Sequence, residues 1–95
     1  MSWLVVLRPV REEMPFEPTE EEARIVSEHY EYLKQLRAEG RLVLAGPSAV
    51  SGDAFGLGIF DQDERADVEA IVARDPAVTN GIMTAEIRPF RISVR

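Results

Sequence analysis

The hydrophobic residues of this chain follow two periodicities, and each predicts one kind of secondary structure. Residues 3–7 and 42–45 are short apolar runs that favour strands, and residues 55–60 alternate apolar side chains with glycines, as expected of a third strand. From Thr19 to Glu39 the apolar positions recur every three or four residues, which predicts an amphipathic helix. The predicted core face of this helix carries Val26, Tyr30, Leu33 and Leu36.

Capping and breaking residues set the ends of the helices. Thr19 and Glu22 match a capping box, and Gly40 suits the C-terminal cap of the first helix. A second helix has its apolar stripe within residues 68–72.

The expected N-terminal cap of the second helix is Asp61 or Asp63. Asp75-Pro76 ends this second helix and could begin a short extra turn, because proline suits the first helical position.

Prolines and glycines predict the remaining connections. Residues 9–18 hold three of the chain's six prolines and are expected to form a loop. Gly46-Pro47 should end the second strand, and residues 48–53 should form a turn. A last strand is predicted from Thr84 to Val94, with Pro89 at a change of phase that indicates a bulge or an edge position.

The predicted order of elements is β-α-β-β-α-β, which is the arrangement of the ferredoxin-like fold. We therefore expect one α+β domain over residues 1–95, with an antiparallel four-stranded sheet and two helices on one face. Residues 3–7 and 42–45 are apolar on both faces of that sheet, so something must cover the face without helices. A second copy of the chain is the simplest cover, and the sequence predicts a homodimer packed sheet to sheet.

The composition argues against several classes of function. Eleven basic residues against seventeen acidic ones give a formal charge of −6, which argues against a nucleic-acid partner. The chain has no cysteine, so disulfides, thiolate metal sites and thiol nucleophiles are excluded. The apolar run at residues 3–7 is too short for a signal peptide or a membrane span, so we expect a cytoplasmic protein without a membrane partner.

The one histidine of the chain is the best candidate for chemistry. His29 lies three residues after Val26 and four before Leu33, so it shares the inward or border face of the first helix. An imidazole can act as a general acid or base near neutral pH, but a histidine in this position also fits a purely structural role. No metal-ligand spacing and no glycine-rich phosphate loop are present, so neither a metal nor a cofactor is expected.

The end of the second strand is a candidate binding element. Gly46, Pro47 and Ser48 could line a ligand site through backbone groups and the Ser48 hydroxyl. The same residues fit an ordinary strand-ending turn, so both interpretations stay open.

An ordered set of residues resembles the YCII-related (YciI-like) family over nearly the whole chain. The set is His29, Leu33, Leu36, Gly40, Leu42, Gly46-Pro47, Asp75-Pro76, Gly81 and Pro89-Phe90. The resemblance implies a ferredoxin-like domain that forms dimers of the dimeric α+β barrel type, with His29 and Asp75 as a proposed active-site pair. A few relatives in that family are dehydrochlorinases of chlorinated hydroxyquinols, and most members have no assigned reaction. The chain departs from the family pattern at Ala77-Val78 and in the loop at residues 9–18.

Two hypotheses about function follow. In the first, the protein is a cofactor-independent enzyme of lyase or isomerase type, in which His29 exchanges a proton with a small aromatic or cyclic substrate and Asp75 orients the ring. In the second, it is a non-catalytic dimeric module that binds a small ligand or a partner protein. An accessible His29 coupled to Asp75 beside a cavity would favour the first.

Overall fold

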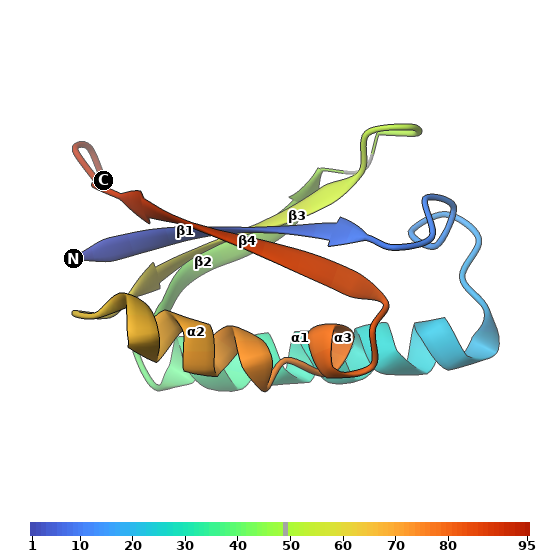
Figure 1. Ribbon diagram of the computed structural model, residues 1–95, viewed down its shortest axis with the longest axis horizontal. Helices are drawn as coiled ribbons and strands as arrows, with labels where there is room; N and C mark the ends of the chain where they lie inside the picture. The colour runs from blue at the N-terminus through green and yellow to red at the C-terminus, as the bar shows by residue number, and fades with distance from the viewer. Residues whose placement is uncertain (49) are drawn as a thin grey trace.

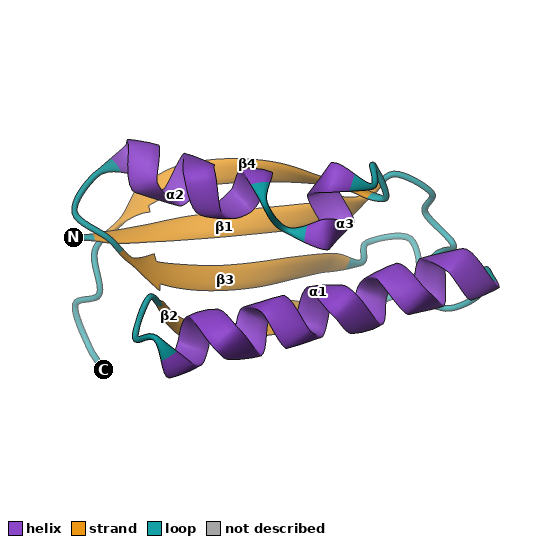
Figure 2. Ribbon diagram, turned by 90° about the horizontal axis from the view of Figure 1, so that it is seen from below, coloured by secondary structure: helices purple, strands orange, loops and turns teal. Residues whose placement is uncertain are grey.

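The computed structural model describes residues 1–48 and 50–95, and these form one four-stranded sheet with helices on one of its faces (Figures 1 and 2). The strands are β1 (Ser2–Pro9), β2 (Leu42–Ser48), β3 (Phe55–Asp61) and β4 (Met83–Phe90). The helices are α1 (Glu20–Ala38), α2 (Arg65–Ala73) and the short α3 (Pro76–Thr79). The strands lie in the order β2-β3-β1-β4, and every neighbouring pair is antiparallel. The predicted ferredoxin-like α+β arrangement is confirmed.

The core lies between the helices and the sheet face that they cover. Figure 1 shows all three helices on the same side of the sheet. The buried cluster between these layers comprises Trp3, Val5, Leu7, Leu36, Leu42, Phe60, Val68 and Ile71. Leu4 and Val6 alternate with the buried residues of β1, so they point to the uncovered face, where they are half-buried.

Capping fixes both ends of α1 as the sequence predicts. Thr19 Oγ1 accepts a hydrogen bond from the Glu22 N–H at 3.1 Å, and Glu22 Oε1 accepts one from the Thr19 N–H at 2.9 Å. At the other end Gly40 has a φ of +78°, a left-handed conformation that favours glycine. The Arg41 N–H then bonds the Leu36 carbonyl at 3.0 Å, which completes a glycine-based C-terminal cap.

The core face of α1 differs from the predicted one. Its buried residues are Ile25, His29 and Leu36, whereas Tyr30 is 42 % exposed. The prediction that Tyr30 belongs to the core was wrong. The physical reason is that the side of α1 that carries Tyr30 borders an open cavity instead of packed side chains.

The start of α2 and the end of β4 also differ from prediction. Glu64 precedes α2 and makes no side-chain cap, so neither Asp61 nor Asp63 caps this helix. β4 ends at Phe90, short of Val94, because its pairing with β1 ends there.

Pro89 marks an edge position, one of its two predicted roles. It lies within an unbroken register between β1 and β4, so it causes no bulge, and β4 is an edge strand of the sheet. The register shift of this sheet lies between Leu42 and Leu44 in β2.

β2 continues through Gly46-Pro47 to Ser48, beyond its predicted end at Ala45. As the other edge strand, β2 tolerates a proline that a central strand would not. The predicted turn at residues 48–53 therefore begins inside a strand, and its Ala49 lies outside the described residues.

Leu36→Ala should lower the free energy of unfolding by about 2–5 kcal/mol, because truncating a buried leucine removes apolar contacts and leaves a cavity. Lys34→Ala is the matched control on the same helix, since the Lys34 side chain is 72 % exposed, and it should change that free energy by less than about 0.5 kcal/mol. Urea denaturation followed by Trp3 fluorescence measures both. Equal losses for the two variants would contradict the placement of the core.

Candidate active site

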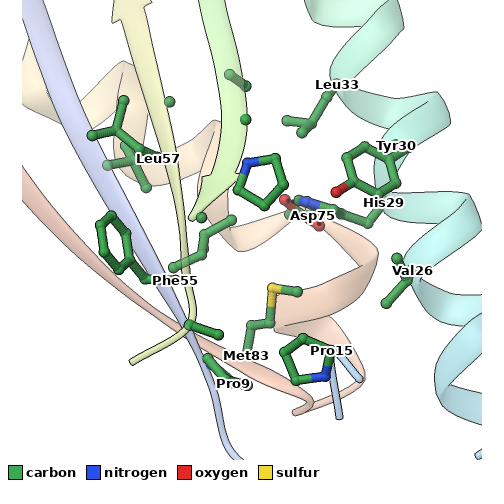
Figure 3. Close-up of a pocket in the computed structure, with 18 of the residues that line it drawn as sticks. Pro9, Pro15, Val26, His29, Tyr30, Leu33, Phe55, Leu57, Asp75 and Met83 are labelled. Carbon is green, nitrogen blue, oxygen red and sulfur yellow. Dashed lines mark hydrogen bonds and ion pairs between the residues drawn. The ribbon is translucent and has the colours of Figure 1, made fainter. Parts of the chain in front are cut away.

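A cavity of about 360 Å³ lies on the helix-covered side of the sheet, between α1, the β2–β3 pair and the loop after β1 (Figure 3). This volume is at the lower end of the ~300–1,000 Å³ range of small-molecule pockets. Most of its lining is apolar. The lining residues come from all four strands, from α1 and α2, and from the loop after β1. Figure 3 shows Val26 and Leu33 of α1, Pro15 of the loop and Met83 of β4 around it.

Two glycines of β3 leave room for this cavity. Gly56 pairs with Leu7 and Gly58 pairs with Val5, so both lie on the face that the helices cover. A Cβ atom on Gly58 would lie 3.0 Å from Phe60 Cε2, and one on Gly56 would lie 3.7 Å from Leu7 Cβ. The bare side of this strand therefore borders the cavity and not the uncovered face of the sheet.

His29 and Asp75 meet at the wall of the cavity. His29 Nδ1 lies 2.7 and 2.8 Å from the two carboxylate oxygens of Asp75. The two residues are only 5 % and 4 % exposed. An ionised carboxylate can only accept hydrogen bonds, so Nδ1 is the donor and the ring orientation is fixed.

Asp75 is itself held by the start of α3. It is the N-cap of this helix, where its Oδ1 accepts a hydrogen bond from the Ala77 N–H at 2.9 Å, and Pro76 follows it at the first helical position. The carboxylate thus caps one helix and binds the histidine of another, so it ties α1 to the start of α3.

The second ring nitrogen of His29 faces the cavity. His29 and Asp75 both line it, and Figure 3 shows the His29 ring between Tyr30 and Asp75. Within residues 1–48 and 50–95, no side-chain nitrogen or oxygen is fully buried without a hydrogen-bond partner. Among these residues only Nδ1 of the ring is hydrogen-bonded, so Nε2 is not sealed from solvent, and the cavity that His29 lines is the space it can reach.

The residues at the end of β2 also border the cavity. Gly46, Pro47 and Ser48 are all part of its lining. Pro47 pairs with Gly56 and so shares the face of His29, whereas Ser48 pairs with Phe55 and has the opposite side-chain direction. Strand pairing therefore places Pro47, and not the Ser48 hydroxyl, on the same side as the histidine.

The loop at residues 10–18 forms a further wall that sequence analysis missed. Met14 is 2 % exposed, and Pro15 and Pro18 line the cavity beside it. A proline-rich, charged segment predicts a solvated loop, and a single buried methionine within it is a weak signal. This wall could be found only from contacts distant in sequence.

Arg11 fastens this loop to α1. Its Nε and Nη2 donate to the two carboxylate oxygens of Glu22 at 3.1 and 2.6 Å, and Nη2 also donates to the Glu17 carbonyl at 2.6 Å. The Arg11 guanidinium, together with the Thr19 N–H, lowers the pKa of Glu22 to about 2. The capping box of α1 is therefore also the anchor of the cavity wall.

Tyr32 connects α1 to α2 on the inner side of the cavity. Its hydroxyl donates a hydrogen bond to the Ile71 carbonyl at 2.6 Å. Burial, and then the negative charge of Asp75, raise the pKa of Tyr32. The Tyr32 hydroxyl thus already donates its hydrogen bond within the protein.

In the part of the chain that the structure describes, no three or more His, Cys, Asp and Glu side chains lie together as a potential metal-binding group. No helix among the described residues is both long and apolar enough to cross a membrane.

Comparison with known proteins identifies relatives of the whole fold. The family model for the YCII-related domain matches residues 1–91. The structure is similar to that of 5-chloro-2-hydroxyhydroquinone dehydrochlorinase (TftG) from Burkholderia phenoliruptrix AC1100, solved in complex with 2,5-dihydroxybenzoquinone. The TM-score is 0.76 at 16 % sequence identity, over 96 % of this chain and 94 % of that one, so this similarity shows a shared fold. No curated protein matches the chain.

The pair formed by Arg11 and Glu22 should make unfolding depend on acid pH. The pKa of Glu22 falls from 4.5 to about 2 on folding, so the unfolded chain binds more protons between these values and stability rises with pH across this window. The contribution is complete above pH 4.5 and is lost as the pH falls through about 2. Thermal unfolding from pH 2 to 6 should therefore show a smaller rise in Tm for Glu22→Gln than for the wild type. Glu20→Gln, an exposed carboxylate of the same helical turn, is the control and should keep the wild-type rise.

Proposed function

The chain belongs to the YCII-related domain family, and from that premise we propose that it is a cofactor-independent acid–base catalyst of a small cyclic or aromatic substrate. The observation that carries the proposal is the pairing of His29 Nδ1 with a buried carboxylate at 2.7 Å, beside a cavity to which Nε2 is open. A histidine held in this way has one nitrogen for its orienting group and one for a reacting molecule.

The chemistry of the proposed reaction is a proton transfer at Nε2. The neutral ring accepts a proton from a C–H or O–H group of the bound molecule, and the Asp75 carboxylate stabilises the imidazolium that forms. Return of the proton to another atom of the substrate completes an isomerisation. Departure of a leaving group with its electron pair completes an elimination. Such acid–base catalysis typically contributes ~10²–10⁴-fold to a rate.

The solved neighbour supports the size and shape of the proposed substrate. That enzyme is named for the removal of chloride from a substituted hydroquinone, and its structure contains a quinone. This chain shares the fold, and its cavity has a volume that accepts one substituted six-membered ring. We extend the class of substrate to this chain on these two grounds.

We also propose that two copies of the chain associate through the uncovered face of the sheet. Leu4 pairs with Ile59 and Val6 pairs with Leu57, so four apolar side chains gather on that face. Leu44, which also pairs with Ile59, is 54 % exposed there. Apolar residues so arranged on an open sheet are typical of an interface, and a second copy supplies a matching surface by symmetry.

We further propose a cytoplasmic location, which is compatible with a chain without cysteine.

The tautomer of His29 tests the proposed catalytic pair without any ligand. In the neutral form of the wild-type ring, the ¹⁵N shifts of the one imidazole should show the proton on Nδ1 and not on Nε2, because the Asp75 carboxylate can only accept. Asp75→Asn should mix the tautomers, since an amide can also donate. A ring protonated on Nε2 in the wild type would exclude it as the general base and favour the non-catalytic binding module.

Catalysis itself is measured as exchange of α-protons for deuterium in a panel of cyclic ketones dissolved in D₂O. The wild type should accelerate exchange for at least one member, and His29→Gln should slow that reaction by about 10²–10⁴-fold. Equal rates for wild type and His29→Gln across the panel would contradict the proposed acid–base role.

Leu44→Glu should convert the proposed dimer to a monomer, because a charge within an apolar interface loses its hydration without gaining a partner. Val10→Glu is the matched control, since Val10 is an exposed apolar residue in the loop after β1. Sedimentation analysis should give a dimer for the wild type and Val10→Glu and a monomer for Leu44→Glu. A monomeric wild type would refute the dimer directly.

A further inference from the structure

Tyr30 occupies an unusual position for an aromatic residue of an amphipathic helix. It is 42 % exposed, and its ring centroid lies 5.3 Å from that of His29 at an interplanar angle of 53°. Figure 3 shows its hydroxyl turned toward the cavity, on the same side as Asp75. An apolar ring that packs into neither the core nor the sheet is thus kept beside the candidate catalytic nitrogen.

The polar side chains of the cavity lining can be divided by whether their hydrogen bonds are already made. Asp75 holds His29 and the Ala77 N–H, and the Tyr32 hydroxyl is bonded to the Ile71 carbonyl. His29 Nε2 and the Tyr30 hydroxyl remain on the helix side of the cavity. Among the described side chains on that side, these two polar groups have no hydrogen bond to another residue.

The charge of the lining restricts the ligand further. Among the described residues that line the cavity, Asp75 is the one acidic side chain, and none is Lys or Arg. A carboxylate or phosphate on the ligand would therefore be desolvated with no Lys or Arg in the lining, next to Asp75 and in a chain with a formal charge of −6. An ammonium group on the ligand would have to compete with His29, because both carboxylate oxygens of Asp75 already contact His29 Nδ1.

We infer that Tyr30 binds the ligand beside His29, and that the ligand is an uncharged ring with two hydrogen-bonding groups, one for His29 Nε2 and one for the Tyr30 hydroxyl. This inference rests on the proposed function, whose site it shares. Tyr30 acts as a specificity-determining residue in this arrangement. It orients the ring so that the group to be protonated or deprotonated lies against the histidine.

Two probes of nearly the same shape, one neutral and one anionic, test the class of ligand. 4-Hydroxybenzamide and 4-hydroxybenzoate share a ring and a hydroxyl, and the amide is a neutral analogue of the carboxylate. Titration into the wild-type protein, followed by NMR, should give a Kd for the amide about tenfold lower or more, because the desolvated carboxylate has no partner. Equal affinities, tighter binding of the benzoate, or no binding of either probe at millimolar concentration would overturn the inference about charge.

Tyr30→Phe tests the role of the residue, and Lys34→Ala is the control from the same helix. Tyr30→Phe should raise the Kd of 4-hydroxybenzamide by about two- to tenfold, the usual value of one hydrogen bond, and leave Tm unchanged. Lys34→Ala, whose side chain is 72 % exposed and outside the cavity lining, should leave both the Kd and Tm unchanged. An unchanged Kd in Tyr30→Phe would overturn the inference about Tyr30.

The His29 signals separate failure of this inference from failure of the proposed function. If the amide shifts the His29 ring signals but Tyr30→Phe binds like the wild type, Tyr30 has no role and the proposed acid–base site stands. If bound amide leaves the His29 signals unchanged, the ligand lies elsewhere and this inference fails. The tautomer of the ligand-free ring then decides the proposed function independently.

Discussion

The carboxylate of Asp75 is the point on which the candidate site depends. It is almost inaccessible to water, and a buried charge is costly unless donors surround it. The donors come from two elements, the imidazole of α1 and the first turn of α3. The same contact that satisfies the charge also sets the distance between these helices. The position of the cavity wall and the orientation of the histidine ring are therefore consequences of one requirement for hydrogen bonding.

The cavity lies between the helices and a part of the sheet whose side chains on that face are small. β3 presents glycines to that face, and the 10–18 loop, anchored by Arg11 to the first turn of α1, closes a side that neither helix reaches. Packed cores leave few voids larger than a water molecule. A space of this size, bordered by a paired histidine, means that α1 and the sheet are not fully packed against each other there, as the proposed ligand site requires.

Local patterns predicted most of the fold but only half of the site. Strand alternation, the capping box at Thr19 and the glycine after α1 depend on neighbours in sequence, so the element order followed from them. His29 could be placed on the border of α1 by spacing alone. Its partner lies 46 residues away, and only the resemblance to a family joined the two. Tyr30 was misplaced because helical periodicity shows which residues share a face, but not whether that face meets a packed layer or an opening. The wall formed by Met14 could not be predicted, since its burial depends on where the loop lies in the folded chain.

The two outer strands carry a consequence for how copies of this chain can meet. β2 has a register shift and Pro47, and β4 has Pro89 and the exposed ion pair of Glu86 with Arg88. Bulges, prolines and charges of this kind are the features by which natural sheets resist the addition of further strands. Continuous edge-to-edge growth, the route to fibrils and aggregates, is thereby disfavoured at both ends of the sheet. A chain with such an apolar open face can then remain in solution as a closed assembly of defined size.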